Sequence, residues 1–221
     1  MNKVGILGGS FDPIHMGHIR IAQNAYEEFS LDEVWFVPAG HSPNKDEHKM
    51  TPAKDRFRMV ELALSDYPQF CLSDIETESE QTSYTYLTLT RLKKRYPNVT
   101  FYFIMGADSL DYFEQWFHPE IICQNAILLV AVRDKLDLKA IREKIASVRA
   151  LFSAEIYPLS GERMDISSTE LRTCAKLQDL ECTEGMLPQK VAEYIAKRGL
   201  YGYGTQGDSK KTEKKAGQRT V

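Results

Sequence analysis

Short apolar runs alternate along the chain with amphipathic segments whose apolar residues recur every three or four positions. The runs are typical of buried strands, and the spacing is typical of helices that cover a sheet. The runs predict strands at residues 4–7, 33–37, 70–72, 99–105, 126–132 and 155–157. Helices are predicted over residues 19–29, 51–64, 85–96, 138–148 and 188–198, with a further helix after Ser167. This order predicts an α/β fold, a doubly wound parallel sheet with helices on both sides.

Several helix ends carry local signals. Thr51 followed by Pro52 is typical of an N-cap and a first helical residue, and Gly199 is typical of a helix end. Ser167 and Glu170 have the spacing of a capping box. The helix that follows Thr51 is predicted to bury the face formed by Ala53, Phe57, Val60 and Leu64.

Residues 1–202 are predicted to form one domain with helices at its C-terminal end. From about Tyr203 the apolar period stops, which predicts a disordered polar and basic tail over residues 203–221. The net charge of −3 gives no general attraction to nucleic acid or to an anionic membrane. No apolar run approaches the length of a membrane span and no signal-type segment opens the chain, so we expect a cytoplasmic protein. The four cysteines include no C-x-x-C pair, which predicts reduced thiols.

The most informative stretch is G-G-S-F-D-P-I-H-M-G-H, which runs from Gly8 to His18 between the first strand and the first helix. Neither G-x-x-x-x-G-K-[ST] nor G-x-G-x-x-G occurs in the chain. A strand, a glycine-rich turn and a helix N-terminus nevertheless form an arrangement that binds phosphate. Gly8 and Gly9 remove side chains where backbone amides would face the phosphate. Gly17 would let a ligand approach between His15 and His18.

Two other interpretations of the histidine pair stay open. Both side chains could be ordinary surface or capping residues. Asp12, His15 and His18 could also bind a metal ion, although no Glu lies beside the pair to act as a base. A glycine-rich turn between a strand and a helix favours anions over cations.

Polar residues follow other predicted strands as well. The loop that contains Lys45 follows the second strand, Gly106–Asp108 follows the central strand, and Arg133 follows the next one. Ser167 comes a few residues after the last strand. Because the carboxyl ends of parallel strands meet at one edge of the sheet, we expect these segments to form one site with the Gly8–His18 turn. Arg133 has a simpler interpretation as a surface residue, and Ser167 as an ordinary N-cap.

Four separate motifs resemble those of a known family. They are the opening G-G-S-F-D-P-I-H-M-G-H, S-Y-T at residues 83–85, G-A-D at 106–108 with Trp116 downstream, and I-S-S-T-E-L-R at 166–172. In order and spacing over residues 3–202, the chain resembles the nucleotidyltransferases whose signature is H-x-G-H. Within that superfamily it resembles the bacterial nicotinate mononucleotide adenylyltransferases. The resemblance implies a Rossmann-like nucleotidyltransferase fold for residues 1–202.

The resemblance implies adenylyl transfer from ATP to nicotinate mononucleotide in NAD biosynthesis. The phosphate of the mononucleotide attacks the α-phosphorus of ATP in line, giving nicotinate adenine dinucleotide and pyrophosphate with no covalent enzyme intermediate. Mg²⁺ is expected to arrive with ATP, held mostly by phosphates and water rather than by protein ligands. The implied partners are these small molecules, with no nucleic acid and no membrane, and a homo-oligomer is left open.

The resemblance also assigns roles to residues. The catalytic set is His15, His18 and Arg172. The residues assigned to ATP are Gly8, Gly9, Ser10, Phe11, Gly17, Gly106, Asp108, Arg133, Ser167 and Ser168. The residues assigned to nicotinate mononucleotide are Lys45, Ser83, Tyr84, Thr85, Tyr112 and Trp116. Trp116 would stack on the pyridine ring, and a core tryptophan between helices is the alternative interpretation.

One loop departs from the family pattern. The chain has S-P-N-K at residues 42–45 where the family commonly has P-P-H-K, so the lysine is kept and the histidine is not. His41 and His48 lie close enough in sequence to substitute for the missing histidine.

Three other functions are rivals to nicotinate mononucleotide adenylyl transfer. They are those of a pantetheine-phosphate adenylyltransferase, a cytidylyltransferase, and a module that binds ATP without turnover. Trp116 and the S-Y-T motif argue against the first two, and the histidine pair with Arg172 argues against the third.

Overall fold

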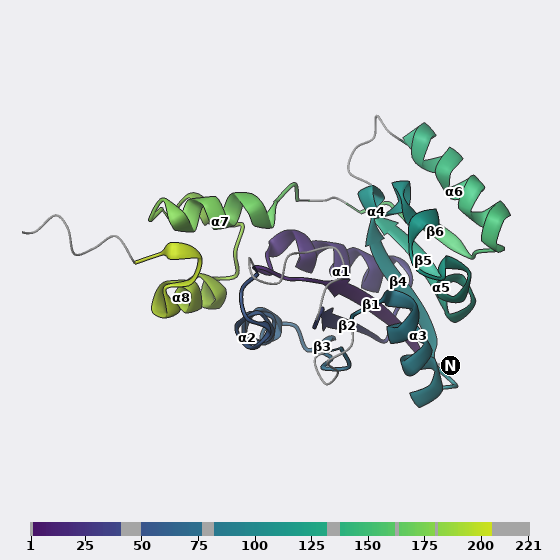
Figure 1. The fold of residues 1–221 in the computed structure, drawn as a ribbon, viewed down its shortest axis with the longest axis horizontal. Helices are drawn as coiled ribbons and strands as arrows, with labels where there is room; N and C mark the ends of the chain where they lie inside the picture. The colour runs from purple at the N-terminus through teal and green to yellow at the C-terminus, as the bar shows by residue number, and fades with distance from the viewer. Residues whose placement is uncertain are drawn as a thin grey trace, which may run out of the picture.

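Six parallel strands form one sheet in the order β3-β2-β1-β4-β5-β6. The computed structural model describes residues 2–40, 50–76, 82–131, 138–161, 164–179 and 181–204. The strands are β1 (Lys3–Gly9), β2 (Glu33–Pro38), β3 (Phe70–Leu72), β4 (Thr100–Gly106), β5 (Ala126–Ala131) and β6 (Ile156–Leu159). Each predicted strand is confirmed to within two residues at its ends, and so is the doubly wound parallel sheet (Figure 1).

The strand order reverses between β1 and β4. From β1 the chain continues to β2 and β3 on one side, and from β4 it continues to β5 and β6 on the other. Leu7 pairs with Ile104, so the carboxyl ends of β1 and β4, at Gly9 and Gly106, lie level with each other. In open α/β sheets the ligand site lies outside such a reversal.

Helices flank the sheet along the described part of the chain. They are α1 (Met16–Glu28), α2 (Ala53–Leu64), α3 (Thr85–Arg95), α4 (Ala107–Asp111), α5 (Pro119–Asn125), α6 (Leu138–Phe152), α7 (Ser168–Lys176) and α8 (Gln189–Arg198). Short 3-10 turns are η2 (Phe113–Gln115), η4 (Glu181–Thr183) and η5 (Leu200–Gly202). The six predicted helices are confirmed. α4 and α5 were not predicted, because helices of five and seven residues are too short to show a clear apolar period.

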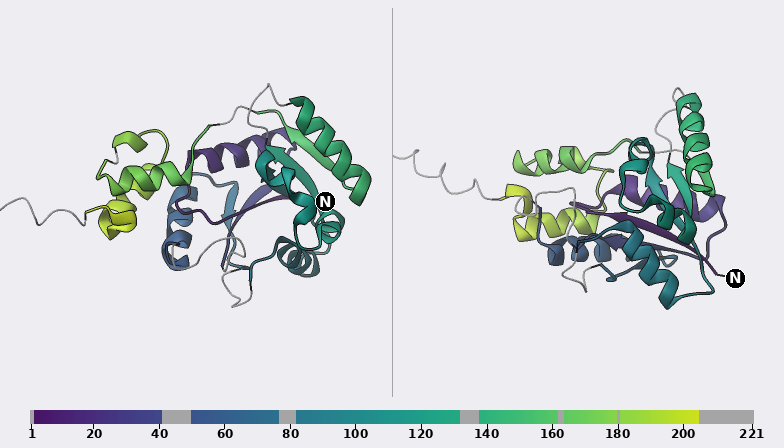
Figure 2. Two further views of the ribbon diagram at one scale, coloured as in Figure 1. Left: turned by 45° about the horizontal axis from the view of Figure 1, so that its top comes forward. Right: turned by 45° about the vertical axis from the view of Figure 1, so that its right-hand side comes forward.

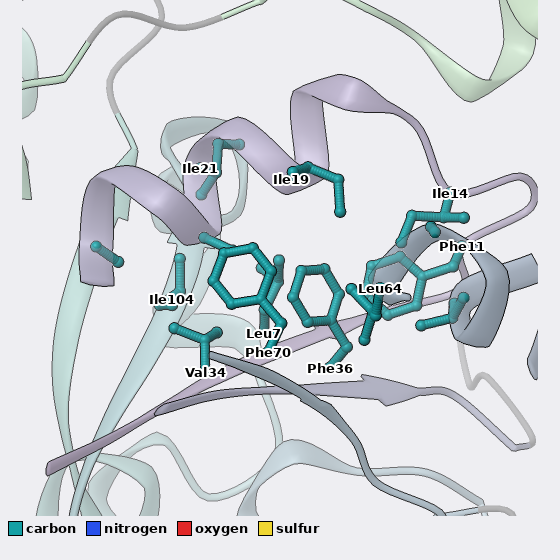
Figure 3. Packing of buried hydrophobic residues seen from close by; sticks show 14 of the residues in the cluster. Leu7, Phe11, Ile14, Ile19, Ile21, Val34, Phe36, Leu64, Phe70 and Ile104 are labelled. Atoms are coloured by element: carbon teal, nitrogen blue, oxygen red, sulfur yellow. The ribbon is translucent and has the colours of Figure 1, made fainter. Parts of the chain in front are cut away.

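Two apolar cores lie on the two faces of the sheet. α1, α2, α7 and α8 contribute to one core, where Ile19 and Ile21 of α1 lie over Phe36 and Phe70 of the sheet (Figure 3). α3, α5 and α6 contribute to the other core, together with strand residues such as Phe103. Because helices cover both faces of the sheet, both sides of each strand are buried, which explains why the strand sequences are continuous apolar runs.

The buried face of α2 differs from the prediction. Val60 and Leu64 are buried as expected, but Ala53 is exposed and Phe57 is half-buried. The residues that are buried instead include a charged one, Arg56, which is 2% exposed. Thr51 is not the N-cap either, since the cap position is Pro52 and has no side-chain hydrogen bond. Instead, the backbone N–H of Thr51 donates to Asp12, and its carbonyl oxygen accepts from Arg56.

α7, α8 and η5 lie together at one end of the molecule, away from β6 and α6 (Figures 1 and 2). The Tyr194 hydroxyl of α8 donates a hydrogen bond of 2.7 Å to Oδ1 of Asp55 in α2. Lys190 Nζ contacts Asp66 Oδ1 at 2.6 Å. The left-handed conformation of Gly199, with φ 62°, ends α8 as predicted.

One cysteine prediction is wrong. Cys174 in α7 and Cys182 in η4 form a disulfide, with their Cα atoms 6.4 Å apart. The two residues are near each other because the chain turns back after α7. Cys71 and Cys123 are free thiols, as predicted. The predicted tail lies outside the described residues from position 205 onward, so its disorder stays a prediction.

Candidate active site

The Gly8–His18 segment forms the turn between β1 and α1, at the reversal of strand order. His15 is the N-cap residue of α1 in an extended conformation, and His18 lies in the first turn of the helix. The Asp12–Pro13 peptide bond is cis. At the start of α1, the backbone N–H of Met16 donates to the carbonyl oxygen of Met186 at 2.8 Å, and that of His18 donates to the carbonyl oxygen of His15 at 2.9 Å. The partial positive charge of the helix N-terminus beside two imidazoles is nevertheless suited to an anion.

The imidazole rings of His15 and His18 lie against each other. Their centroids are 3.7 Å apart with an interplanar angle of 31°, and the His15 side chain is buried. The backbone N–H of His15 donates to Nδ1 of His18 at 3.3 Å. With Nδ1 acting as an acceptor, the hydrogen of a neutral His18 ring sits on Nε2, from which it can be donated to a phosphate oxygen.

Gly17 is required by close packing. A Cβ atom at this position would lie 3.0 Å from His15 Nδ1 and 3.2 Å from the carbonyl oxygen of Met164. The predicted reason for this glycine was an approach of ligand between the two imidazoles. The structure shows a different reason, because the space beside Gly17 holds the His15 ring and the backbone that precedes α7.

The late I-S-S-T-E-L-R motif lies directly on the opening turn. Arg172 Nη1 donates to the carbonyl oxygen of Asp12 at 2.7 Å, and Ser168 Oγ donates to that of Pro13 at 3.0 Å. Ser167 is the N-cap of α7, and its hydroxyl accepts from Thr169 N–H at 3.2 Å. The prediction that the first and last motifs converge is confirmed.

Two residues from outside this turn hold it, and neither was singled out for that role from the sequence. Arg56 donates to the carbonyl oxygens of Ser10 at 2.8 Å, Ala39 at 2.8 Å and Thr51 at 3.0 Å. Asp12 accepts from the Tyr201 hydroxyl at 2.7 Å. A charged residue on the apolar face of α2 was the available signal for Arg56. For Tyr201 the only signal in the sequence was an aromatic residue just beyond the last predicted helix.

The S-Y-T motif begins α3, with Tyr84 as N-cap and Thr85 as the first helical residue. Ser83 Oγ accepts from the backbone N–H of Gly40 at 3.1 Å, which connects this motif to the end of β2. Nearby, the hydroxyl of Thr88 donates to Glu76 Oε1 at 2.6 Å. Burial raises the pKa of Glu76, partly offset by hydrogen bonds from Thr88 and Ser83.

Trp116 is half-buried beside the carboxyl end of β4. Its ring packs against Phe113 and Phe103, with centroids 5.4 and 6.2 Å apart. Its indole Nε1 is buried and has no hydrogen-bond partner within the described residues. Tyr112 is 44% exposed. The packing fits the core interpretation on one side of the indole, and stacking on a pyridine ring stays a prediction.

The remaining predicted residues are placed as follows. Gly106 is the N-cap of α4, and Asp108 is exposed in the first turn of α4, directly after the end of β4. Phe11 packs in the core against Phe36 and His18, so only its backbone can face a nucleotide. Lys45 and Arg133 lie outside the described residues.

Across the described ranges, no group of three or more His, Cys, Asp or Glu side chains is placed to hold a metal ion. The proposed metal set of Asp12, His15 and His18 is therefore not assembled. Both Asp12 carboxylate oxygens accept hydrogen bonds, from Tyr201 and from the backbone N–H of Thr51. In the same part of the chain, no helix combines the length and apolar character needed to cross a membrane.

The parallel sheet, its reversal point and the histidine turn define a Rossmann-like nucleotidyltransferase. The Cytidylyltransferase-like family matches residues 6–174, and the chain belongs to that family. A relative from Lachnoclostridium phytofermentans, named "Probable nicotinate-nucleotide adenylyltransferase", is 39% identical over 201 residues, covering 91% of this chain and all of the relative. A relative of the same name from Clostridium botulinum strain Okra is 38% identical over 202 residues, covering 91% of this chain and 99% of the relative.

Solved structures share the fold. The nicotinic acid mononucleotide adenylyltransferase of Plasmodium falciparum complexed with NaAD matches with a TM-score of 0.77 at 23% identity. The match covers 93% of this chain and all of that one. The same Plasmodium protein complexed with APC matches with a TM-score of 0.75. These matches confirm the predicted fold class.

Proposed function

We propose that this chain transfers the adenylyl group of ATP to nicotinate mononucleotide, giving nicotinate adenine dinucleotide and pyrophosphate in NAD biosynthesis. The observation that carries the proposal is the docking of Arg172 and Ser168 onto the turn that presents His15 and His18. Relatives of about the same length, at 38–39% identity, have names that state this activity. We propose a cytoplasmic enzyme that acts on small molecules.

In this proposal the histidine turn and α7 receive the triphosphate. His15 and His18 donate to phosphate oxygens on which charge grows in the transition state, and Arg172 with Ser167 and Ser168 binds the departing phosphates. One such donor contributes roughly 3 kcal/mol, by analogy with oxyanion holes. The backbone at Gly8, Gly9, Ser10 and Phe11 would follow the phosphates, and Gly106, Asp108 and Arg133 would face the adenosine.

Nicotinate mononucleotide would lie on the α3 side of the same edge. Backbone amides at Ser83, Tyr84 and Thr85, around the N-terminus of α3, would receive the nicotinate carboxylate. Trp116 and Tyr112 would contact the pyridine ring, and Lys45 the phosphate. Mg²⁺ would arrive with ATP and would neutralise phosphate charge. The Asp12 carboxylate would not be its ligand, since both oxygens already accept hydrogen bonds from Tyr201 and Thr51.

The test mixes the pure protein with ATP, Mg²⁺ and nicotinate mononucleotide, and measures both pyrophosphate and the dinucleotide. Replacing the second substrate with nicotinamide mononucleotide should lower kcat/KM, because amides placed for a carboxylate fit the amide group poorly. His15→Ala and His18→Ala should each reduce kcat by roughly a hundredfold. The proposal fails if no pyrophosphate is released while a known adenylyltransferase works alongside.

The family match keeps a cytidylyltransferase as the second candidate. A panel that exchanges ATP for CTP, and nicotinate mononucleotide for phosphopantetheine, separates the members of the superfamily. Binding of ATP without any turnover in the whole panel would favour the nucleotide-binding module instead.

A further inference from the structure

Tyr201 reaches the catalytic turn from the far end of the described chain. Its hydroxyl donates to Oδ1 of Asp12 at 2.7 Å across 189 residues of sequence. The other carboxylate oxygen accepts from Thr51 N–H at 3.3 Å, and Asp12 is 4% exposed. The side chain of Asp12 is therefore fixed between η5 and the start of α2, three positions before His15.

The backbone conformation of Tyr201 is energetically unfavourable, which indicates that surrounding contacts hold this residue in place. Tyr201 has φ 59°, in the left-handed region that a non-glycine residue rarely adopts. Residues persist in this region when surrounding contacts determine their conformation. Besides Asp12, the hydroxyl lies 3.9 Å from Met59 Sδ, and the ring packs in the α1–α2 core.

The Tyr201 hydroxyl acts as a donor. Burial and the neighbouring Asp12 carboxylate raise the pKa of Tyr201 above its usual range, so the hydroxyl keeps its hydrogen at neutral pH. Different polar contacts hold the side chain of Asp12 and the backbone of the turn. Tyr201 holds the Asp12 side chain, while Arg172 and Ser168 hold the carbonyl oxygens of Asp12 and Pro13.

We propose that Tyr201 is a positioning residue for the reaction, which acts through Asp12 to hold the turn that presents His15 and His18. This inference rests on the proposed function for its kinetic part. Without the Tyr201 hydroxyl the buried Asp12 carboxylate loses its 2.7 Å partner and the turn shifts. A misplacement of about 1 Å can reduce a rate roughly a hundredfold, so a smaller shift should reduce kcat about tenfold.

The chain offers a matched control. Tyr194 in α8 makes the same kind of hydrogen bond, 2.7 Å from its hydroxyl to Asp55 Oδ1, between the same C-terminal segment and α2. Its acceptor, Asp55, is in the first turn of α2 and not in the histidine turn. Tyr194→Phe and Tyr201→Phe therefore remove equivalent hydrogen bonds, and only the second should affect catalysis.

The experiment compares both variants with the wild type in steady-state kinetics and in NMR spectra of the histidine side chains. The chain has only five histidines, so the His15 and His18 signals can be assigned. We expect Tyr201→Phe to lower kcat about tenfold with KM for ATP within twofold, and to shift both imidazole signals. Tyr194→Phe should leave kcat and these signals unchanged.

Three outcomes overturn the inference. One is equal loss of kcat in the two variants, another is a loss confined to KM, and the third is unshifted imidazole signals in Tyr201→Phe. A double mutant adds a further test, since Tyr201→Phe should change kcat no further in an Asp12→Ala background. The NMR spectra need no substrate. If the wild type makes no product, the proposed function fails, and the imidazole signals alone decide the role of Tyr201.

Discussion

At the scale of single residues, the H-x-G-H pattern is explained by packing between segments far apart in sequence. Gly17 lies under the His15 ring on one side and the Met164 carbonyl on the other. A methyl group here meets atoms at 3.0–3.2 Å, closer than ordinary van der Waals contact. The glycine therefore fixes both the position of His15 and the approach of the strand-to-α7 segment.

Gly17→Ala should separate activity from stability. Alanine is favoured over glycine in a helix by about 1 kcal/mol, which offsets part of the strain, so the unfolding free energy should change little. The His15 ring must move by a few tenths of an ångström, so kcat should fall about tenfold. Steady-state kinetics and urea denaturation of the same preparation test this. Unchanged kcat would show that the position of His15 is not controlled by Gly17.

Glu76 is a partly buried carboxyl beside the S-Y-T motif. Its pKa is raised above the ordinary value of 4.5, chiefly by burial. The folded state therefore holds a proton on Glu76 more tightly than the unfolded chain does. The stabilising contribution is complete below the unfolded pKa and is lost as the pH rises through the folded pKa.

Glu76→Gln should remove this pH dependence. Glutamine is neutral at every pH and keeps an oxygen that can accept from Thr88. The unfolding free energy of the variant, relative to wild type, should increase between pH 4.5 and 7. Urea denaturation at several pH values measures it. Glu120→Gln is the control, because the pKa of Glu120 is lowered, chiefly by a backbone hydrogen bond, and its substitution should give the opposite sign.

At the scale of elements, Arg56 ties three segment ends to one another. Its guanidinium joins the turn after β1 at Ser10, the end of β2 at Ala39 and the start of α2 at Thr51. The side chain is 2% exposed, so these carbonyl oxygens depend on it for their hydrogen bonds. The planar guanidinium suits several carbonyl oxygens at once, which an ammonium group does not.

Arg56→Lys should lower the unfolding free energy by roughly 3 kcal/mol, because one ammonium group cannot reach all three carbonyl oxygens. Arg58→Lys on the same helix is the control. Its guanidinium contacts Glu61 on the surface, where both side chains are half exposed, so the change should stay below about 0.5 kcal/mol. Chemical denaturation tests both variants, and equal effects would contradict the structural role of Arg56.

The same residue explains where prediction from sequence failed at this scale. Strands were predictable because burial on both faces makes them continuous apolar runs. The helical period of α2 was also visible, but the predicted buried face was only partly right, because it did not include Arg56. A charged residue among apolar positions is only a weak signal for burial, because most charged residues lie on the surface. α5 was missed for another reason, since seven residues give too few repeats.

At the scale of the whole molecule, the convergence of the first and last motifs could be predicted from the rule for open α/β sheets. Gly8–His18 and Ser167 both follow strands, and those strands end at one edge. The return of Tyr201 to Asp12 could not, because it depends on how α7, α8 and η5 pack on α2. The disulfide between Cys174 and Cys182 could not be predicted either, because it depends on how the chain turns back between α7 and η4.

If the motifs at residues 8–18 and 166–172 form one site, a nucleotide bound there must make both segments less mobile. A non-hydrolysable ATP analogue should slow amide hydrogen exchange in residues 8–19 and 164–172 together, because Met164, Ser168 and Arg172 lie on the opening turn. α6 is the internal control, since it packs on the other face of the sheet. Protection limited to residues 8–19 would show that α7 supports the turn without contributing to the nucleotide site, and the assignment of Arg172 to the phosphates would then be wrong.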